Sequence, residues 1–239
     1  MSPTEFRTGV IKPFECVKEG WELIKSDYWL LFAITLVGAI IGGVTMYILL
    51  GAMACGIFLA YLKKIDGQLV AFDDLWAGMK YFGPGFVVML AMIVPMIVVY
   101  ALVYVPILAA TIMGQRMGEE EIMAMVFGIL ALDFVLIVLM VCFHTLLMFA
   151  FPLIVDRQLG GIAAIKTSII SVWKNLSGVA GLVGVNFLLT LLGYAALCFG
   201  LYFVIPIMIA GTVVAYRKVF PHTLSPNFAP PPPNAYKGL

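Results

Sequence analysis

Two ionisable residues inside an apolar stretch are the best candidates for chemistry in this sequence. Asp133 lies about a third of the way along the run from Ile122 to Phe151, and His144 follows eleven residues later. Eleven residues make about three helical turns, so both side chains project from one face of a helix. A proton or cation path across a membrane needs ionisable groups aligned in this way in a water-lined space. The spacing therefore makes transport one hypothesis.

The second hypothesis for Asp133 is structural, and we favour it: Asp133 is either neutral or hydrogen-bonded to a polar neighbour, and it only holds helices together. A carboxylate in the middle of a membrane span costs about 2.5–3.5 kcal/mol on insertion scales, and a hydrogen bond to a neighbouring helix offsets part of this cost. Asn186, Thr190 and Tyr194 recur at four-residue spacing in a later apolar run. They form a polar stripe that could hold the partner of Asp133.

The composition indicates the class of protein that positions these residues. Hydrophobic residues make up 63% of the 239 residues and charged residues only 11%, whereas soluble domains average about 25% charged residues. The chain is therefore expected to be a polytopic integral membrane protein surrounded by membrane lipids. Its net charge of +1 shows no basic excess that would indicate nucleic-acid binding.

The apolar runs predict an all-α integral membrane protein with six transmembrane helices arranged as three hairpins. The first run, 28–62, contains no charge and is too long for one span, so we expect it to break at Gly42 and Gly43. The predicted spans are 27–42, 44–63, 85–113, 122–151, 177–199 and 201–219. They form one membrane domain, 1–221.

An amphipathic segment precedes each predicted hairpin, at about 12–26, 69–82 and 160–175. Each segment carries one tryptophan, Trp21, Trp76 or Trp173, and such helices lie in the membrane interface with tryptophan near the headgroups. Two of the connecting loops also share the pattern Asp-x-Gln-Leu, which begins at Asp66 and at Asp156. These similarities indicate either a unit repeated three times or loops that are simply amphipathic.

The basic residues predict the topology. Three hairpins place thirteen of the fourteen Lys and Arg residues on one side of the membrane, and only Arg116 on the other. Because cytoplasmic loops are rich in Lys and Arg, both termini are expected in the cytoplasm and the chain in the cell membrane. The proline-rich tail, 222–239, is then cytoplasmic and is either a flexible end or a strand that docks a partner.

Small residues indicate where helices approach one another closely. Gly38 and Gly42 form one GxxxG motif, and Gly181 and Gly184 belong to overlapping small-residue pairs. Such motifs allow close packing of membrane helices. The partner helix belongs either to this chain or to another one, including a second copy in a homo-oligomer.

Three stretches of the sequence resemble a bacterial multi-pass family whose members are often labelled "glycerophosphoryl diester phosphodiesterase membrane domain". They are "GAMACGIFLAYLKKIDGQLVAFDDLWAGMKYF", "FPLIVDRQLGGIAAIKTSIISVWKNL" and "IPIMIAGTVVAYRKVF". The resemblance covers most of residues 10–221 and implies an all-helical fold in the bacterial cytoplasmic membrane. It implies no phosphodiesterase activity, because that activity belongs to a soluble domain fused to some members.

The sequence predicts a non-catalytic membrane protein that acts as a scaffold, as an accessory subunit of a membrane complex or as a lipid-interacting module. It contains no recognisable catalytic, phosphate-binding or metal-binding motif, so we expect no enzyme activity, cofactor or metal. The alternative is a small transporter or channel that uses Asp133 and His144. A lipid-acting enzyme would need polar residues clustered at the cytoplasmic interface. Several are expected there, without a recognised spacing: Asp66, Asp73, Asp74, Asp156, Arg157 and Lys166.

Overall fold

The computed structural model describes residues 5–112, 118–196 and 199–221, and these residues form helices without any strand. The predicted tail, 222–239, and Arg116 lie outside the described residues. The helices follow in the order α1 (Pro13–Ile24), α2 (Tyr28–Val44), α3 (Leu50–Ile65), α4 (Asp74–Ala77), η1 (Gly78–Tyr81), α5 (Phe82–Ile112), α6 (Glu119–Leu146), α7 (Ala150–Arg157), α8 (Gly161–Lys174), α9 (Leu176–Ala195) and α10 (Phe199–Val219).

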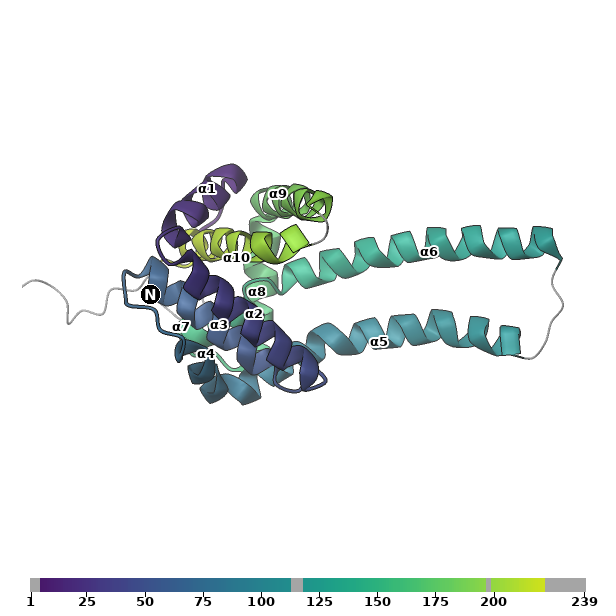
Figure 1. Ribbon diagram of the computed structural model, residues 1–239, viewed down its shortest axis with the longest axis horizontal. Coiled ribbons are helices and arrows are strands. Elements are labelled where there is room, and N and C mark those ends of the chain that lie inside the picture. Colours follow the sequence, from purple (N-terminus) through teal and green to yellow (C-terminus); the bar gives the residue numbers. More distant parts are fainter. Residues whose placement is uncertain (1–4, 113–117, 197–198, 222–239) are drawn as a thin grey trace, which may run out of the picture.

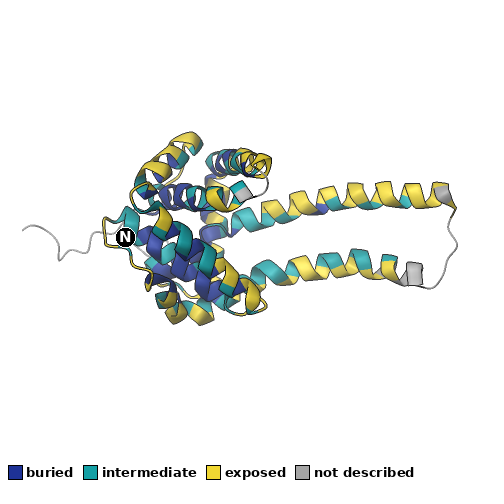
Figure 2. Cartoon of the chain, viewed as in Figure 1, coloured by how far each residue is buried: buried dark blue, intermediate teal, exposed yellow. Residues whose placement is uncertain are grey.

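Two long helices project from a body formed by the others (Figure 1). Helix α5 has 31 residues and α6 has 28, so at about 1.5 Å per residue they reach about 42–47 Å. That is longer than the hydrocarbon core of a bilayer, about 30 Å. The two helices run beside each other, and most side chains along α6 are exposed, whereas the buried residues gather in the body (Figure 2).

Helix α3 lies at the centre of the body and packs against α2, α5, α7 and α10. Ala52, Gly56 and Ala60 are all buried and recur every four residues, so one face of α3 carries only small side chains. A Cβ atom added at Gly56 would overlap the carbonyl oxygen of Leu75, and one at Gly78 would overlap the backbone of Gly56. The backbones of α3, α4 and η1 therefore lie in direct contact along this face.

Four helical segments are long and apolar enough to cross a membrane: Asp74–Val105, Glu120–Arg157, Leu176–Ala195 and Gly200–Val219. The pair α1 and α2, which bends by 104°, would add a fifth. The structure confirms the all-helical fold over the described residues, and its four to five candidate spans fit a multi-pass membrane protein. The structure does not confirm the predicted six transmembrane spans, because α2 and α3 have only 17 and 16 residues and are short for a span.

Several predicted boundaries differ from the structure for local reasons. Helix α2 continues past Gly42 and Gly43, and the chain turns at Met46 and Tyr47, both with positive φ. The helix predicted over 122–151 ends at Leu146, and residues 150–157 form the separate, buried helix α7. The second amphipathic segment is helical only from Asp74.

The three predicted anchors Trp21, Trp76 and Trp173 are all exposed. On α1 the buried face consists of Cys16, Gly20 and Ile24, and it packs on α10. A Cβ atom at Gly20 would lie 2.7 Å from the backbone nitrogen of Gly211, so this contact also requires glycine. The buried side of α1 therefore depends on small residues, which leaves Trp21 facing outwards.

The predicted packing glycines fall into two groups. Gly38 contacts Ile57, Gly42 contacts Leu50 and Gly181 contacts Pro13, each too closely to leave room for a Cβ atom. These partners belong to the same chain, so the glycines pack helices of one molecule. A Cβ atom at Gly184 would meet nothing within 4 Å, so this glycine has no packing role among the described residues.

Candidate functional site

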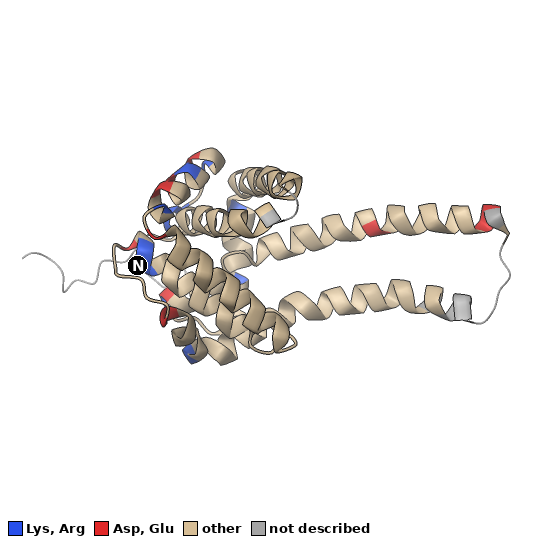
Figure 3. Cartoon of the chain, viewed as in Figure 1, with Lys and Arg blue, Asp and Glu red and all other residues tan. Residues whose placement is uncertain are grey.

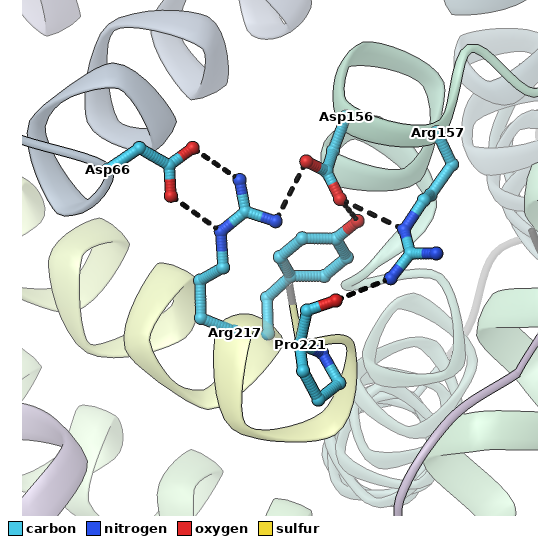
Figure 4. Close-up of polar contacts among 6 residues, drawn as sticks. Asp66, Asp156, Arg157, Arg217 and Pro221 are labelled. Atoms are coloured by element: carbon cyan, nitrogen blue, oxygen red, sulfur yellow. Dashed lines mark hydrogen bonds and ion pairs between the residues drawn. The ribbon is translucent and has the colours of Figure 1, made fainter. Parts of the chain in front are cut away.

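A cluster of charged residues joins the ends of three helices (Figure 4). The guanidinium of Arg217, in the last turn of α10, donates two hydrogen bonds to Asp66: Nε to Oδ1 at 3.0 Å and Nη2 to Oδ2 at 2.6 Å. Its third nitrogen, Nη1, lies 2.7 Å from Oδ1 of Asp156 at the end of α7. One arginine therefore holds two carboxylates from different helices, which the planar guanidinium fork allows.

The second oxygen of Asp156 has its own donors. Tyr216 donates its hydroxyl hydrogen to Oδ2 of Asp156 at 2.7 Å, and Nε of Arg157 lies 3.2 Å from the same oxygen. Arg157 also donates from Nη2 to the backbone carbonyl of Pro221 at 2.7 Å. The side chains of Arg217 and Asp156 are only 10% and 12% exposed. Two arginines and two aspartates thus balance in charge in a place that water barely reaches.

The cluster explains the repeated sequence pattern. The Asp-x-Gln-Leu motifs start at Asp66 and Asp156, and these two aspartates lie on either side of Arg217 (Figure 4). Each motif ends a helix with a left-handed residue: Gly67, with φ of 71°, after α3, and Gln158, with φ of 52°, after α7. Each of the three stretches that resemble the family contributes one residue to this cluster: Asp66, Asp156 or Arg217.

The cluster favours a structural role over a catalytic one. Its charges are directed at each other, and an acid or base acting on a lipid would have to leave these contacts. The other polar residues expected at this side are not part of the cluster: Asp74 pairs with Lys63 and accepts from the backbone of Ala71, while Asp73 and Lys166 are exposed. Among the described residues, no group of three or more His, Cys, Asp or Glu could hold a metal ion.

Asp133 lies in the projecting hairpin and bonds to the facing helix. Tyr104 of α5 directs its hydroxyl at both carboxylate oxygens of Asp133 in α6, at 2.5 and 2.6 Å. The partner is therefore Tyr104 rather than the α9 stripe that the sequence suggested. Asp133 itself is only partly buried. Apart from Asp133, the acidic residues in the described part of the hairpin all lie near its tip (Figure 3).

The other predicted polar residues are not gathered around Asp133. The Nδ1 atom of His144 lies 2.8 Å from the carbonyl of Met140 in its own helix, about 16 Å along α6 from Asp133. Thr190 donates to the carbonyl of Asn186 within α9. The side-chain oxygen of Asn186 is buried without a hydrogen-bond partner among the described residues, and Tyr194 is exposed.

Sequence reasoning missed Asn175, which ties the N-terminal segment to the body. Asn175 is 3% exposed; its Oδ1 accepts from the backbone nitrogen of Gly9 at 2.8 Å, and its Nδ2 donates to the carbonyl of Arg7 at 3.1 Å. The available signal was an asparagine directly before an apolar run, the usual position of a helix N-cap. Its long-range partners could not be read from the sequence.

Comparisons with known proteins add no relative. No protein-family model matches the chain, and neither the curated proteins nor the solved structures contain a match. The family resemblance described above therefore stays a prediction.

Proposed function

We propose that the chain is a non-catalytic integral membrane protein that acts as a scaffold or accessory subunit of a membrane complex. In this proposal the α5–α6 hairpin is the arm that binds another membrane protein. The main support is the incomplete hydrogen bonding of Asp133. An ionised carboxylate offers about four acceptor positions, and within the described residues Asp133 receives a hydrogen bond only from Tyr104.

The surroundings of Asp133 explain why a partner is needed. Leu130 and Ile137 lie one helical turn to either side of Asp133 and are 59% and 52% exposed. This face of α6 is therefore open to the membrane, where a carboxylate with a single neutral donor is costly. A partner helix with a hydrogen-bond donor or a cation would supply the missing interactions and cover the apolar face.

The charged residues of the body support a scaffold rather than an enzyme. Several of them link helices of this chain to one another: Arg217 with Asp66 and Asp156, Lys63 with Asp74, Lys64 with Asp27, and Lys218 with Glu19. These pairs hold the body together as the base of the projecting hairpin.

We expect the Asp133→Leu variant to lose a membrane protein that co-purifies with the wild-type chain. The test is affinity purification from native membranes in mild detergent, followed by identification of co-migrating proteins. Leucine leaves the Tyr104 hydroxyl unpaired, at a cost of about 1–2 kcal/mol, so size-exclusion chromatography must show that the variant still folds. Val135→Ala, on the opposite face of α6, is the matched control. Identical sets of proteins with all three chains would contradict the proposal.

The proposal also includes the finer topology of six spans in three hairpins, with both termini and segments 63–84 and 152–176 in the cytoplasm. The ends of α3, α7 and α10 lie together at the charged cluster, which supports a common side for these segments. Helices α2 and α3 reach only about 24–26 Å, so they need a locally thinner bilayer or tilted neighbours.

Cysteine labelling tests this topology. In a background without the four native cysteines, single cysteines replace Gln68, Gln158 or Gly118. We expect an impermeant thiol reagent added outside intact cells to label position 118 alone. Positions 68 and 158 should react only after the membrane is opened, and labelling of either from outside would exclude the three-hairpin arrangement.

The transporter alternative predicts a different result for the conservative variant Asp133→Asn. Asparagine keeps a hydrogen bond to Tyr104 but cannot carry a proton or balance a cation. We expect vesicles that contain the wild-type protein or Asp133→Asn, loaded with a pH-sensitive dye, to show the same proton leak with and without an imposed potential. A flux present only in the wild type would favour the transporter.

A further inference from the structure

The corner between α1 and α2 carries a surface pocket with an unusual lining. The pocket has a volume of about 520 Å³ and is lined by Trp21, Lys25, Ser26, Asp27, Tyr28, Trp29 and Leu30. Three of these seven residues are aromatic, one is a cation and one is an anion. The partner-binding hairpin described above takes no part in this pocket.

The bend at the corner suits a position at the level of lipid headgroups. Helices α1 and α2 meet at 104°, so α1 lies along the membrane surface when α2 enters the bilayer. The charged face of α1 is exposed, with Lys18 and Glu22 among its members. A helix with charges on one face and an exposed tryptophan is suited to this interfacial position.

Aromatic rings extend from the pocket towards the hydrocarbon. The ring of Tyr28 lies 5.7 Å from that of Trp21 and 5.5 Å from that of Trp29, measured between centroids. The chain of rings continues through Phe32 to Phe203 on α10, 5.2 Å away from Phe32 and stacked on it. Trp29 is 70% exposed. These rings offer an apolar surface for an acyl chain directly below a polar opening.

The polar groups at the opening are of both signs. Lys25 pairs with Glu22 at the surface, and the two side chains are each 54% exposed. Asp27 precedes the first residue of α2, and hydrogen bonds from Lys64 and from Ser26 lower the pKa of its carboxyl. Asp27 therefore carries its negative charge at neutral pH and is 41% exposed. The pocket thus presents one ammonium and one carboxylate to a ligand.

We propose that the α1–α2 corner binds the headgroup of a zwitterionic phospholipid of the surrounding bilayer. The phosphate lies against Lys25, and the ammonium lies against Asp27 and the faces of Tyr28 and Trp29, which attract cations. The acyl chains follow the rings towards Phe203. Lys64 and Ser26 both contact Oδ2 of Asp27, so its Oδ1 can accept from the lipid ammonium. An anionic lipid without an ammonium would lack this contact and the contact with the rings of Tyr28 and Trp29, so the site discriminates between these lipid classes.

Tryptophan fluorescence tests this site in the purified full-length chain in detergent. Phenylalanine replaces the exposed Trp76 and Trp173, so that only Trp21 and Trp29 emit. We expect short-chain phosphatidylethanolamine to cause a saturable change, and short-chain phosphatidylglycerol to bind about tenfold more weakly because it lacks the ammonium. Equal affinity for the two lipids would overturn the proposal.

Two variants and a soluble probe complete the test. Lys25→Gln and Asp27→Asn should each weaken phosphatidylethanolamine binding by about tenfold, whereas Glu15→Gln on α1, outside the pocket, should not change it. Within the described part of the chain, Lys25 forms an ion pair only with the exposed Glu22, so Lys25→Gln stays informative if Asp27→Asn disturbs the fold. Unchanged binding by Lys25→Gln, or the same response to inorganic phosphate alone, would refute a lipid site. None of these results depends on a protein partner.

Discussion

Replacing Arg217 by methionine will destabilise the folded chain by about 3–5 kcal/mol, because it removes the one cation that Asp66 and Asp156 share and leaves an excess negative charge in a nearly dry environment. The side chains of Asp66 and Asp156 are only 16% and 12% exposed, so neither can regain full hydration while the helices stay packed. The measurement is the loss of native tryptophan fluorescence on unfolding in mixed detergent micelles.

Two further variants show whether this loss comes from charge. Lys218, the next residue, pairs with Glu19, which is 52% exposed, so Lys218→Gln should cost less than about 1 kcal/mol. Adding Asp66→Asn to Arg217→Met removes the excess negative charge while Asp156 keeps Arg157 as its partner, and should restore much of the stability. If Arg217→Met is no less stable than Lys218→Gln, the cluster does not hold the three helix ends together.

A single methyl group at Gly56 is expected to have a comparable effect. The added Cβ atom would overlap the carbonyl oxygen of Leu75, and a backbone carbonyl cannot move aside as a side chain can. Relief requires α3 to separate from α4 and η1, at a cost of about 3 kcal/mol or more. Unfolding of Gly56→Ala in the same micelles measures this cost.

Gly43 supplies the matched control because a Cβ atom there meets nothing within 4 Å. Gly43→Ala lies in helix α2 and should be neutral or stabilising by about 0.5–1 kcal/mol, since alanine favours the helix over the unfolded chain. Equal stability of Gly56→Ala and Gly43→Ala would contradict the close contact between α3 and α4.

The local parts of the fold were predictable because they depend on neighbouring residues. Composition indicated membrane helices. Trp21, Trp76 and Trp173 are exposed, and their predicted position in the membrane interface stays a prediction. The short turn after α2 was expected at Gly42 and Gly43, but it forms at Met46 and Tyr47. Gly42 is instead needed for contact with Leu50, so a glycine that permits a turn and one that permits packing look alike in a sequence.

The long-range contacts were not predictable. The two Asp-x-Gln-Leu motifs were visible, but their meeting point on Arg217 depends on how α3, α7 and α10 pack. Ala52, Gly56 and Ala60 form a regular stripe of small residues that could have identified the central helix. For Asp133, helical periodicity correctly gives the face it shares with His144. It cannot give the neighbouring helix, which places Tyr104 of α5 against Asp133.

Photo-crosslinking in native membranes tests the central claim most directly. A photoreactive amino acid replaces Leu130 or Ile137, on the face of α6 that carries Asp133, or Val135 on the opposite face. We predict one membrane-protein adduct from positions 130 and 137, none from 135, and loss of that adduct when Asp133 is replaced by leucine. Lipid adducts alone from all three positions, or a protein adduct that persists in the leucine variant, would contradict a partner bound through Asp133.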